Sequence, residues 1–312
     1  MTAPAVWHAR SKRIQLDRPF VMGILNVTPD SFSDGGQFES IDAALSQAKR
    51  MVAEGAHGID VGGESTRPQG ATVVSAAEEI RRVVPVIRAI RAEFPDLPIS
   101  VDTTKAGVAA SALDAGADII NDVSGLRLDP SLGEIVATSG AGVVLMHSRG
   151  GVAEMGTYMF AEYDGDVLTS VIDELRSAAA RATSAGVRHE AIVIDPGIGF
   201  AKRSNHSLRV LANLHRVASL GYPILVGVSR KRFVGELSGV EGAADRVAGT
   251  VAANVAALMH GARVFRVHDV APNGEALAVA WGILQAEDRR EPPGDGDDAL
   301  VPGSPLPVPG SH

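Results

Sequence analysis

The chain of 312 residues contains no cysteine. Disulfide bonds, thiolate nucleophiles, Cys-ligated zinc and iron–sulfur clusters are therefore excluded, and a reducing compartment is permitted. Long hydrophobic runs are missing too, since no uninterrupted apolar run approaches the ~18 residues of a membrane span. Residues 1–18 carry charges and lack the apolar core of a secretory signal. We expect a cytoplasmic protein without a membrane partner.

Positive charge is also scarce. The 29 Lys and Arg residues against 37 Asp and Glu residues give a formal net charge of −8. This balance argues against a nucleic-acid partner, because a nucleic-acid-binding face must neutralise phosphates. The hydrophobic fraction of 45% is enough for a sizeable core. Local basic groups can still hold a small anion.

Eight apolar, β-branched segments alternate with helical ones, and no hairpin signal lies between them, so a parallel sheet is required. Strands are predicted at 20–26, 57–62, 98–102, 117–122, 142–147, 191–195, 223–228 and 263–268. Helices are predicted at 41–55, 75–92, 104–115, 130–139, 164–186, 204–220, 244–261 and 272–286. Eight such units fit a (β/α)₈ TIM barrel, which takes ~250 residues. A doubly wound sheet announces itself by a Gly-rich dinucleotide turn after its first strand; this chain has Thr28-Pro29-Asp30-Ser31 there.

Three regions are predicted along the chain. Residues 1–18 form an N-terminal extension, in which Trp7 to Asp17 make a short lid over the bottom of the barrel. Residues 19–287 form the (β/α)₈ barrel domain. Residues 288–312 are rich in proline, glycine and acidic residues without an amphipathic period, so we expect this tail to be disordered.

Polar residues end every predicted strand, whereas the strand bodies are apolar. The strand ends are Asn26, Asp60 to Pro68, Asp102-Thr103, Asn121-Asp122, His147, Asp195 to Gly197, Ser229 to Arg232, and Arg266 to Asp269. Barrel active sites lie at the carboxyl ends of the strands. The first strand in addition opens into a loop of ligand-type side chains, Asn26 to Gly36, although Pro-Asp and Gly-Gly are also common in ordinary turns.

These groups sort by what they can bind. Asp102, Asn121 and Asp195 offer acceptors and one donor pair, which suit a heterocycle rich in N–H groups. The alternative is that each Asp caps the following helix or turn. His147, at the end of the fifth predicted strand, fits a place in the site and a place in the core equally well.

Lys231, Arg266 and His268 gather at the last two strands, where barrels often bind phosphate, and Asn26 closes the ring beside them. They indicate a phosphate or pyrophosphate site with Mg²⁺. A solvated surface is a fair alternative for the neighbours Arg230 and Arg232.

With these residues in view, the chain resembles the dihydropteroate synthase family from about Val21 to Val270. The matching motifs are MGILNVTPDSFSDGG (22–36), GAHGIDVGGESTRP (55–68), SVDT (100–103), INDV (120–123), DPGIGF (195–200), SRK (229–231) and RVHD (266–269). So many motifs in family order make the match highly specific.

The resemblance implies a (β/α)₈ transferase that condenses 6-hydroxymethyl-7,8-dihydropterin pyrophosphate with p-aminobenzoate, giving 7,8-dihydropteroate and pyrophosphate in folate biosynthesis. It implies that the pterin is held by Asp102, Asn121, Asp195 and Lys231. It implies that the pyrophosphate is held by Asn26, Arg266 and His268, with Asn26 also a Mg²⁺ ligand. Thr66, Arg67, Pro68, Phe200 and Lys231 would border the aminobenzoate pocket, and the loop with Asp34 would close over the reactants. Catalytic roles are thereby expected for Asp34, Asp102, Lys231, Arg266 and His268, in a homodimer formed through outer helices.

The chemistry suggests a dissociative, SN1-like step, because the aminobenzoate amine is a weak nucleophile and the protein does best by helping pyrophosphate leave. Two departures from the family pattern affect the aminobenzoate side. Arg232 stands where many members have Ser, and Ala201 stands where Gly is more frequent.

Three other functions are compatible with part of the pattern. A pterin-binding methyltransferase domain on the same barrel would share the pterin residues, but it would not need the loop after the first strand or the anion groups. A metal-dependent hydrolase using His147, His268 and Asp195 is disfavoured because no His-x-His occurs in the chain. A catalytically silent pterin-binding paralogue remains open.

Overall fold

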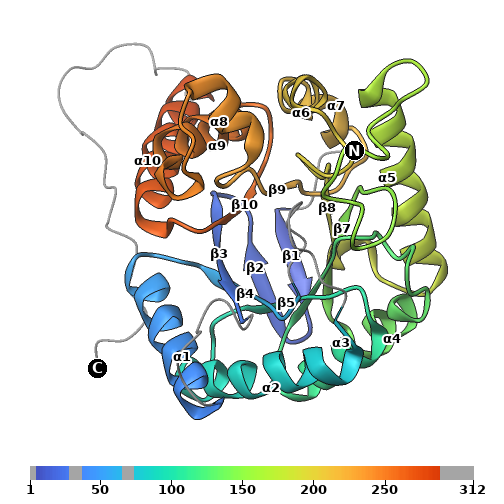
Figure 1. Ribbon diagram of the computed structural model, residues 1–312, viewed down its shortest axis with the longest axis vertical. Coiled ribbons are helices and arrows are strands. Elements are labelled where there is room, and N and C mark those ends of the chain that lie inside the picture. Colours follow the sequence, from blue (N-terminus) through green and yellow to red (C-terminus); the bar gives the residue numbers. More distant parts are fainter. Residues whose placement is uncertain (1–4, 28–36, 65–73, 289–312) are drawn as a thin grey trace, which may run out of the picture.

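The computed structural model describes residues 5–27, 37–64 and 74–288, in which a ring of parallel strands is surrounded by helices (Figure 1). The eight-stranded sheet has the order β8-β7-β6-β5-β4-β3-β10-β9. A parallel bridge between Ile194 and Ile224 joins β8 to the segment just before β9, which brings the two ends of the sheet together. The predicted (β/α)₈ barrel is confirmed.

The barrel strands lie where the apolar segments predicted them. They are β3 (Phe20–Asn26), β4 (Gly58–Gly62), β5 (Ile99–Asp102), β6 (Ile119–Asp122), β7 (Gly142–Met146), β8 (Ile192–Asp195), β9 (Leu225–Val226) and β10 (Val264–Val267). No described helix is long and apolar enough to cross a membrane.

The helices follow the prediction with two differences. They are α1 (Gln37–Ala53), α2 (Ala76–Glu93), α3 (Ala106–Asp114), α4 (Ser131–Ser139), α5 (Val167–Ser184), α6 (Ser204–Leu211), α7 (Leu214–Ala218), α8 (Arg232–Ser238), α9 (Val247–Met259) and α10 (Val270–Asp288). The single helix expected over 204–220 is broken at Asn213, whose φ of −127° and ψ of 27° are not helical. The short helix α8 was not predicted.

Strands β6, β8 and β10 are apolar near their start and polar near their end on the inward face. Ile119, Val193 and Val264 belong to the inner apolar cluster. Two positions later on the same strands come Asn121, Asp195 and Arg266. Because side chains alternate along a strand, these pairs point to the same side of the sheet. The barrel interior is therefore filled at one end and lined with polar groups at the other.

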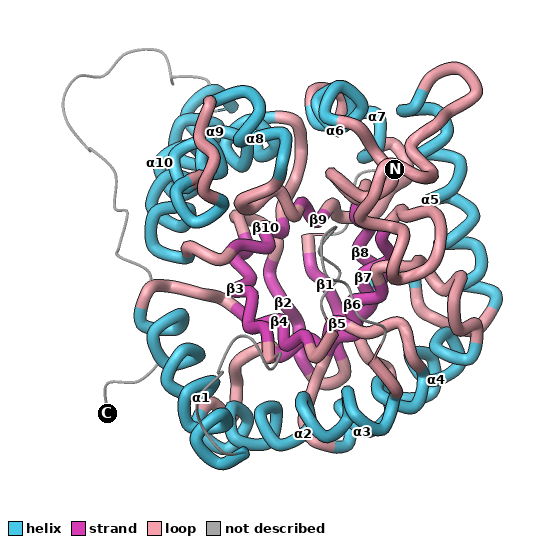
Figure 2. The backbone as a smooth tube through the Cα atoms, in the orientation of Figure 1, coloured by secondary structure: helices cyan, strands magenta, loops and turns pink. Residues whose placement is uncertain are grey.

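A β-hairpin covers the apolar end of the barrel. Strands β1 (Val6–Ala9) and β2 (Lys12–Gln15) pair antiparallel, and Figure 2 shows them across the opening of the ring. Trp7 and Ile14 are buried in one cluster with the inner residues of the barrel strands, and Trp7 Nε1 donates to the Ala191 carbonyl at 2.9 Å. The predicted cover is therefore present, in the form of a hairpin that the sequence does not signal, because Arg10, in the turn, takes a positive φ of 56° without the usual Asn or Gly.

This packing predicts a large stability loss for Trp7→Ala. The side chain is completely buried, so its removal should lower the free energy of unfolding by about 3–5 kcal/mol through the cavity that it leaves. Guanidinium unfolding followed by circular dichroism measures this. Leu237→Ala, at a position 66% exposed, serves as the control and should change it by about 0.5 kcal/mol or less. Equal losses of unfolding free energy in the two variants would contradict the proposed packing of the hairpin against the barrel.

Candidate active site

The polar ends of the strands meet at one mouth of the barrel. Asn26, Asp102, Asn121 and Asp195 lie at or next to the last position of β3, β5, β6 and β8. Arg266 is the penultimate residue of β10. The topology therefore gathers the residues predicted from five separate motifs at one place.

Arg266 holds the centre of this mouth. Its Nε donates to Asp60 Oδ2 at 2.6 Å and its Nη2 to Asp102 Oδ2 at 2.8 Å. Asn121 Nδ2 donates to the same Asp60 oxygen at 3.0 Å. We call Asp60, Asp102, Asn121 and Arg266 the central network.

Burial sets the charge state of the central network. It raises the pKa of Asp102 to about 7; the positive charge of Arg266 opposes the shift, and the negative charges of Asp60, Glu79 and Asp122 add to it. Burial lowers the pKa of Arg266, but the carboxylates of Asp60 and Asp102 more than reverse this, so it stays above its ordinary value. Arg266 is therefore a permanent cation, whereas Asp102 can gain or lose a proton near neutral pH.

Asp60 was predicted among the polar strand ends but was given no role in the site. It lies in the middle of the apolar run Gly58–Gly62 with a completely buried side chain, and its second oxygen, Oδ1, has no hydrogen-bond partner in the described part of the chain. The available signal was a carboxylate inside a buried strand, because a buried charge has to be paired.

Asp195 and Lys231 lie beside the network and influence each other's pKa through their charges. Asp195 Oδ1 accepts from the Gly197 amide at 2.7 Å. Burial raises the pKa of Asp195, opposed by Lys231. Burial also lowers the pKa of Lys231 to about 8, opposed by Asp195. Lys231 Nζ donates to the Ile198 carbonyl and lies 4.3 Å from the centroid of the Phe200 ring.

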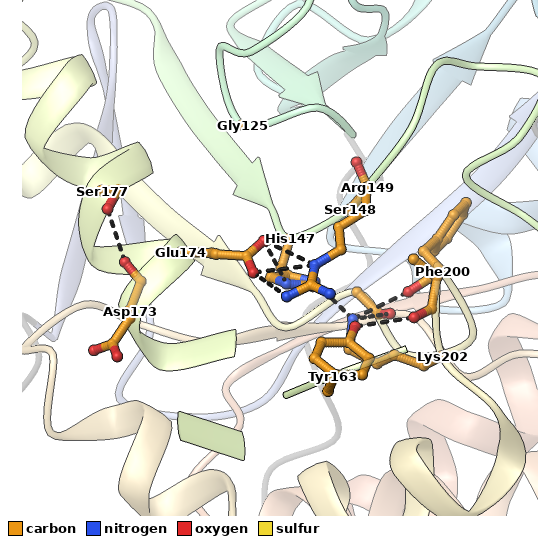
Figure 3. A network of polar contacts seen from close by, with 12 residues as sticks. Gly125, His147, Ser148, Arg149, Tyr163, Asp173, Glu174, Ser177, Phe200 and Lys202 are labelled. Carbon is orange, nitrogen blue, oxygen red and sulfur yellow. Dashed lines mark hydrogen bonds and ion pairs between the residues drawn. The ribbon is translucent and has the colours of Figure 1, made fainter. Parts of the chain in front are cut away.

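The loop after β8 is held by the buried side chain of Lys202, which contacts His147 (Figure 3). Lys202 Nζ is 2.7 Å from His147 Nδ1 and donates to the carbonyls of Gly197 and Phe200 at 3.0 and 3.1 Å. The two side chains are buried. His147 thus packs beneath the loop against Lys202. Lys202 was not predicted, since a lysine after a loop carries no sequence signal of its burial.

His268 and Arg230 are held by their neighbours. The His268 amide donates to Ser229 Oγ at 3.1 Å, and His268 Nδ1 is 3.0 Å from the same oxygen. Arg230, with a positive φ of 59°, pairs with Asp269 through Nε at 2.9 Å. This ion pair joins the segments that follow β9 and β10, the two strands that bring Lys231 and His268 to the mouth.

The two departures from the family pattern lie near Phe200. Arg232 and Arg203 both stack on the Tyr158 ring, with guanidinium carbons 4.5 and 5.4 Å from its centroid. Ala201 adopts a positive φ of 46°, a region that Gly occupies at lower cost, which explains why glycine suits this position. Its carbonyl accepts from the Tyr163 hydroxyl at 2.9 Å.

Asp34, Thr66, Arg67 and Pro68 lie outside the described residues. The residues on either side of the segment that contains Thr66, Arg67 and Pro68 are described: Glu64 Oε1 accepts from the Val74 amide at 2.6 Å.

The metal expectation rests on Asn26. Among residues 5–27, 37–64 and 74–288 no group of three acidic or histidine side chains is placed to hold a metal ion. A side chain at Gly62 would place its Cβ 3.6 Å from both Asn26 Oδ1 and Asp102 Cβ. Its absence leaves room between the amide oxygen and the carboxyl group.

Comparisons with known proteins agree with this geometry. A family model described as pterin binding enzyme matches residues 22–268. A dihydropteroate synthase of Synechocystis sp. is 46% identical over 263 residues, which cover 84% of this chain and 89% of the relative. The solved structure of Xanthomonas albilineans dihydropteroate synthase with 4-aminobenzoic acid has a TM-score of 0.83 at 44% identity, covering 92% of this chain and 99% of that one. The same enzyme in complex with 7,8-dihydropteroate gives 0.79 at 43% identity, covering 89% and 99%.

The raised pKa of Asp102 predicts a pH-dependent stability effect of Asp102→Asn. The folded protein keeps a proton on Asp102 up to about pH 7, whereas the unfolded chain releases it near the usual value of 3.8. The ionised group therefore costs stability increasingly between these pH values. Since the asparagine is never ionised, the variant should gain stability over wild type, and more at pH 8 than at pH 5.

Guanidinium unfolding at both pH values tests this, with the exposed Asp96→Asn as a matched control. A difference from wild type that is the same at pH 5 and pH 8 for Asp102→Asn would contradict the account.

Proposed function

The chain belongs to the pterin-binding enzyme family, and we propose that it acts as the dihydropteroate synthases of that family do. As a transferase it joins 6-hydroxymethyl-7,8-dihydropterin pyrophosphate to p-aminobenzoate, and it releases 7,8-dihydropteroate and pyrophosphate in folate biosynthesis. We expect it in the cytoplasm.

The central network is the observation that carries the proposal. Arg266 binds two carboxylates through Nε and Nη2. Its third nitrogen, Nη1, has no partner in the described part of the chain. A guanidinium in this position donates to Asp102, a proposed pterin ligand, on one side and has N–H groups left for an anion on the other.

The pterin end is an acceptor-rich pocket. Asp102, Asn121 and Asp195 supply oxygen acceptors for the N–H groups of the ring. When those N–H groups bind Asp102, they favour its charged form and lower its pKa. Lys231 supplies a cation for the ring carbonyl and stands between the pterin and aminobenzoate sides.

The pyrophosphate end is cationic. Arg266 and His268 would bind the phosphate oxygens and stabilise the charge that grows as the group leaves. Asn26 fits Mg²⁺, because Gly62 leaves room beside its amide oxygen, and Mg²⁺ is commonly bound by one or two protein ligands plus substrate phosphates. When bound, the ion would neutralise part of the pyrophosphate charge.

We infer a dissociative, SN1-like displacement. Asp102 and Asp195 would favour positive charge on the methylene carbon of the pterin. This route needs no covalent bond between the enzyme and the pterin. The aminobenzoate would then add to the cation from the side of Phe200 and Lys231. Thr66, Arg67 and Pro68 are proposed to complete that pocket, and the loop with Asp34 is proposed to keep water out. A trapped covalent adduct of enzyme and pterin would rule this mechanism out.

The first test is pyrophosphate release by the purified protein with dihydropterin pyrophosphate and Mg²⁺, with and without p-aminobenzoate. Release that depends on p-aminobenzoate and yields dihydropteroate supports the proposal. Tight pterin binding without turnover would point instead to a silent paralogue, or to a methyltransferase domain if methyltetrahydrofolate is the better ligand.

Arg266→Ala is expected to lower kcat about 10²-fold or more, because it removes a preorganised donor to the leaving group. Arg263→Ala is the matched control, since Arg263 directly precedes the same strand and stacks on Trp281 at the opposite end. His268→Gln provides a second variant that leaves Asp60 and Asp102 paired. Normal turnover of both Arg266→Ala and His268→Gln would refute the pyrophosphate assignment.

A homodimer through α9 and α10 is also proposed. These helices lie side by side (Figure 1), and α9 buries the polar Thr250 and Asn254 while Met259 is 45% exposed. On α10, Val279 and Ile283 are 63% and 55% exposed. Exposed apolar residues gathered on neighbouring helices are typical of a surface that a second copy covers.

The wild-type protein should therefore have twice the chain mass of 32.4 kDa in light scattering after size-exclusion chromatography. The double variant Val279→Asp with Ile283→Asp should shift it to the monomer, because each subunit would bury charges. Leu128→Asp, at an exposed position on another face, should leave the mass unchanged. A monomeric wild type would refute the proposed interface.

A further inference from the structure

Lys202 is a buried cation that the proposed reaction does not use. It is 1% exposed and lies beneath the loop from Gly197 to Ala201 (Figure 3). Three acceptor atoms surround its Nζ: His147 Nδ1 at 2.7 Å, the Gly197 carbonyl at 3.0 Å and the Phe200 carbonyl at 3.1 Å. Burial lowers its pKa well below the ordinary value, and the negative charges of Asp195 and Glu174 oppose the shift.

The neighbouring residues determine which nitrogen atoms of Lys202 and His147 carry protons. Burial and the charge of Lys202 lower the pKa of His147 to about 4, so the ring is neutral and carries one proton. His147 Nε2 is 3.1 Å from Glu174 Oε2, a close contact that does not have full hydrogen-bond geometry. The proton belongs on Nε2, since a bare nitrogen would face a carboxylate at that distance. Nδ1 is then an acceptor, and three acceptors around Lys202 Nζ require the three donors of an ammonium group.

Asp195 and, after it, Glu174 balance this buried charge. Burial raises the pKa of Glu174, but His147 and Arg149 more than reverse the shift and bring it to about 2. Arg149 holds the carboxylate through Nε at 3.1 Å and stacks on Tyr163, 4.1 Å from the ring centroid. The row of contacts from Lys202 through His147 to Glu174 thus leads from the loop to α5, where the Glu174 side chain is half-exposed.

The loop held by Lys202 needs such a support. Gly197 and Gly199 have positive φ angles of 65° and 80°, and a Cβ at Gly197 would lie 1.9 Å from the His147 carbonyl oxygen. Lys202 binds the carbonyls of Gly197 and Phe200, while Lys231 binds the Ile198 carbonyl between them. Two lysines therefore fix the backbone that carries the Phe200 ring.

We propose that Lys202, kept as an ammonium by neutral His147 and ionised Glu174, is a positioning residue that sets the Phe200 ring against Lys231 for p-aminobenzoate binding. The inference rests on the proposed function, in which Phe200 and Lys231 border the aminobenzoate pocket. The pterin side depends less on the loop, because Asp102 and Asn121 belong to strands β5 and β6. Asp195 does accept from the Gly197 amide, but it belongs to strand β8 and its carbonyl also accepts from the His147 amide at 2.8 Å. Loss of Lys202 should therefore act on one substrate more than on the other.

The kinetic test compares Lys202→Met with wild type. Misplacement of the Phe200 wall should raise KM for p-aminobenzoate about ten-fold or more. KM for dihydropterin pyrophosphate should rise less, by about two-fold, since Asp102 and Asn121 lie on other strands and only Asp195 and Lys231 also bond to this loop. Tyr163→Phe is the matched control, because it removes the hydrogen bond to the neighbouring Ala201 carbonyl and leaves those to Gly197 and Phe200; its effect should be smaller.

Glu174→Gln is a milder second variant, because Glu174 is 40% exposed in its side chain and glutamine still offers an oxygen to His147. It should raise KM for p-aminobenzoate in the same direction. Histidine ¹⁵N spectra supply an independent readout: the His147 Nδ1 signal of wild type should be that of an acceptor nitrogen, and Lys202→Met should shift it.

A crystal structure of Lys202→Met separates this inference from the proposed function. A Phe200 ring that keeps its place over Lys231, or a rise of equal size in both KM values, would overturn the positioning role. A wild-type protein without turnover would instead count against the proposed function, and the position of the Phe200 ring would still decide the role of Lys202.

Discussion

The pairing of Arg266 with two buried carboxylates is the interaction on which the site depends. Asp60 is completely buried and Asp102 nearly so, and neither would tolerate that environment as an isolated charge. One guanidinium from β10 compensates carboxylates from β4 and β5, strands that lie on the far side of β3 in the sheet. Strands β10, β3, β4 and β5 have to assemble into one curved sheet before these charges can meet, so the fold and the charge state of the site are linked.

This arrangement costs stability for the sake of binding. Burial and neighbouring carboxylates keep the pKa of Asp102 near 7, so the free protein holds an acceptor group that is only partly ionised at neutral pH. A ligand with N–H groups supplies the missing partners and favours the charged form. The same principle is seen beneath the loop after β8, where Lys202 is compensated by His147 and Glu174.

Strand positions and most of the proposed ligands could be predicted from the sequence, because apolar runs ending in polar residues mark parallel strands and the ends of barrel strands converge. Asn121, Asp195 and Arg266 were found in this way. Asp60 was found among the polar strand ends but given no role, and Lys202 was not placed in the site, since the importance of both comes from burial, which is a tertiary property. The N-terminal hairpin and α8 were not predicted, for local reasons. The hairpin turn has Arg10 at positive φ, and α8 is a helix of only seven residues.

The most direct test of the central claim is a ¹³C NMR titration of the Asp102 carboxyl group, assigned with Asp102→Asn, in the free protein and with dihydropterin pyrophosphate bound. The account predicts a midpoint near pH 7 in the free protein and a downward shift of about one pH unit or more on binding. A midpoint near the usual 3.8 in the free protein, or one that binding leaves unchanged, would contradict it.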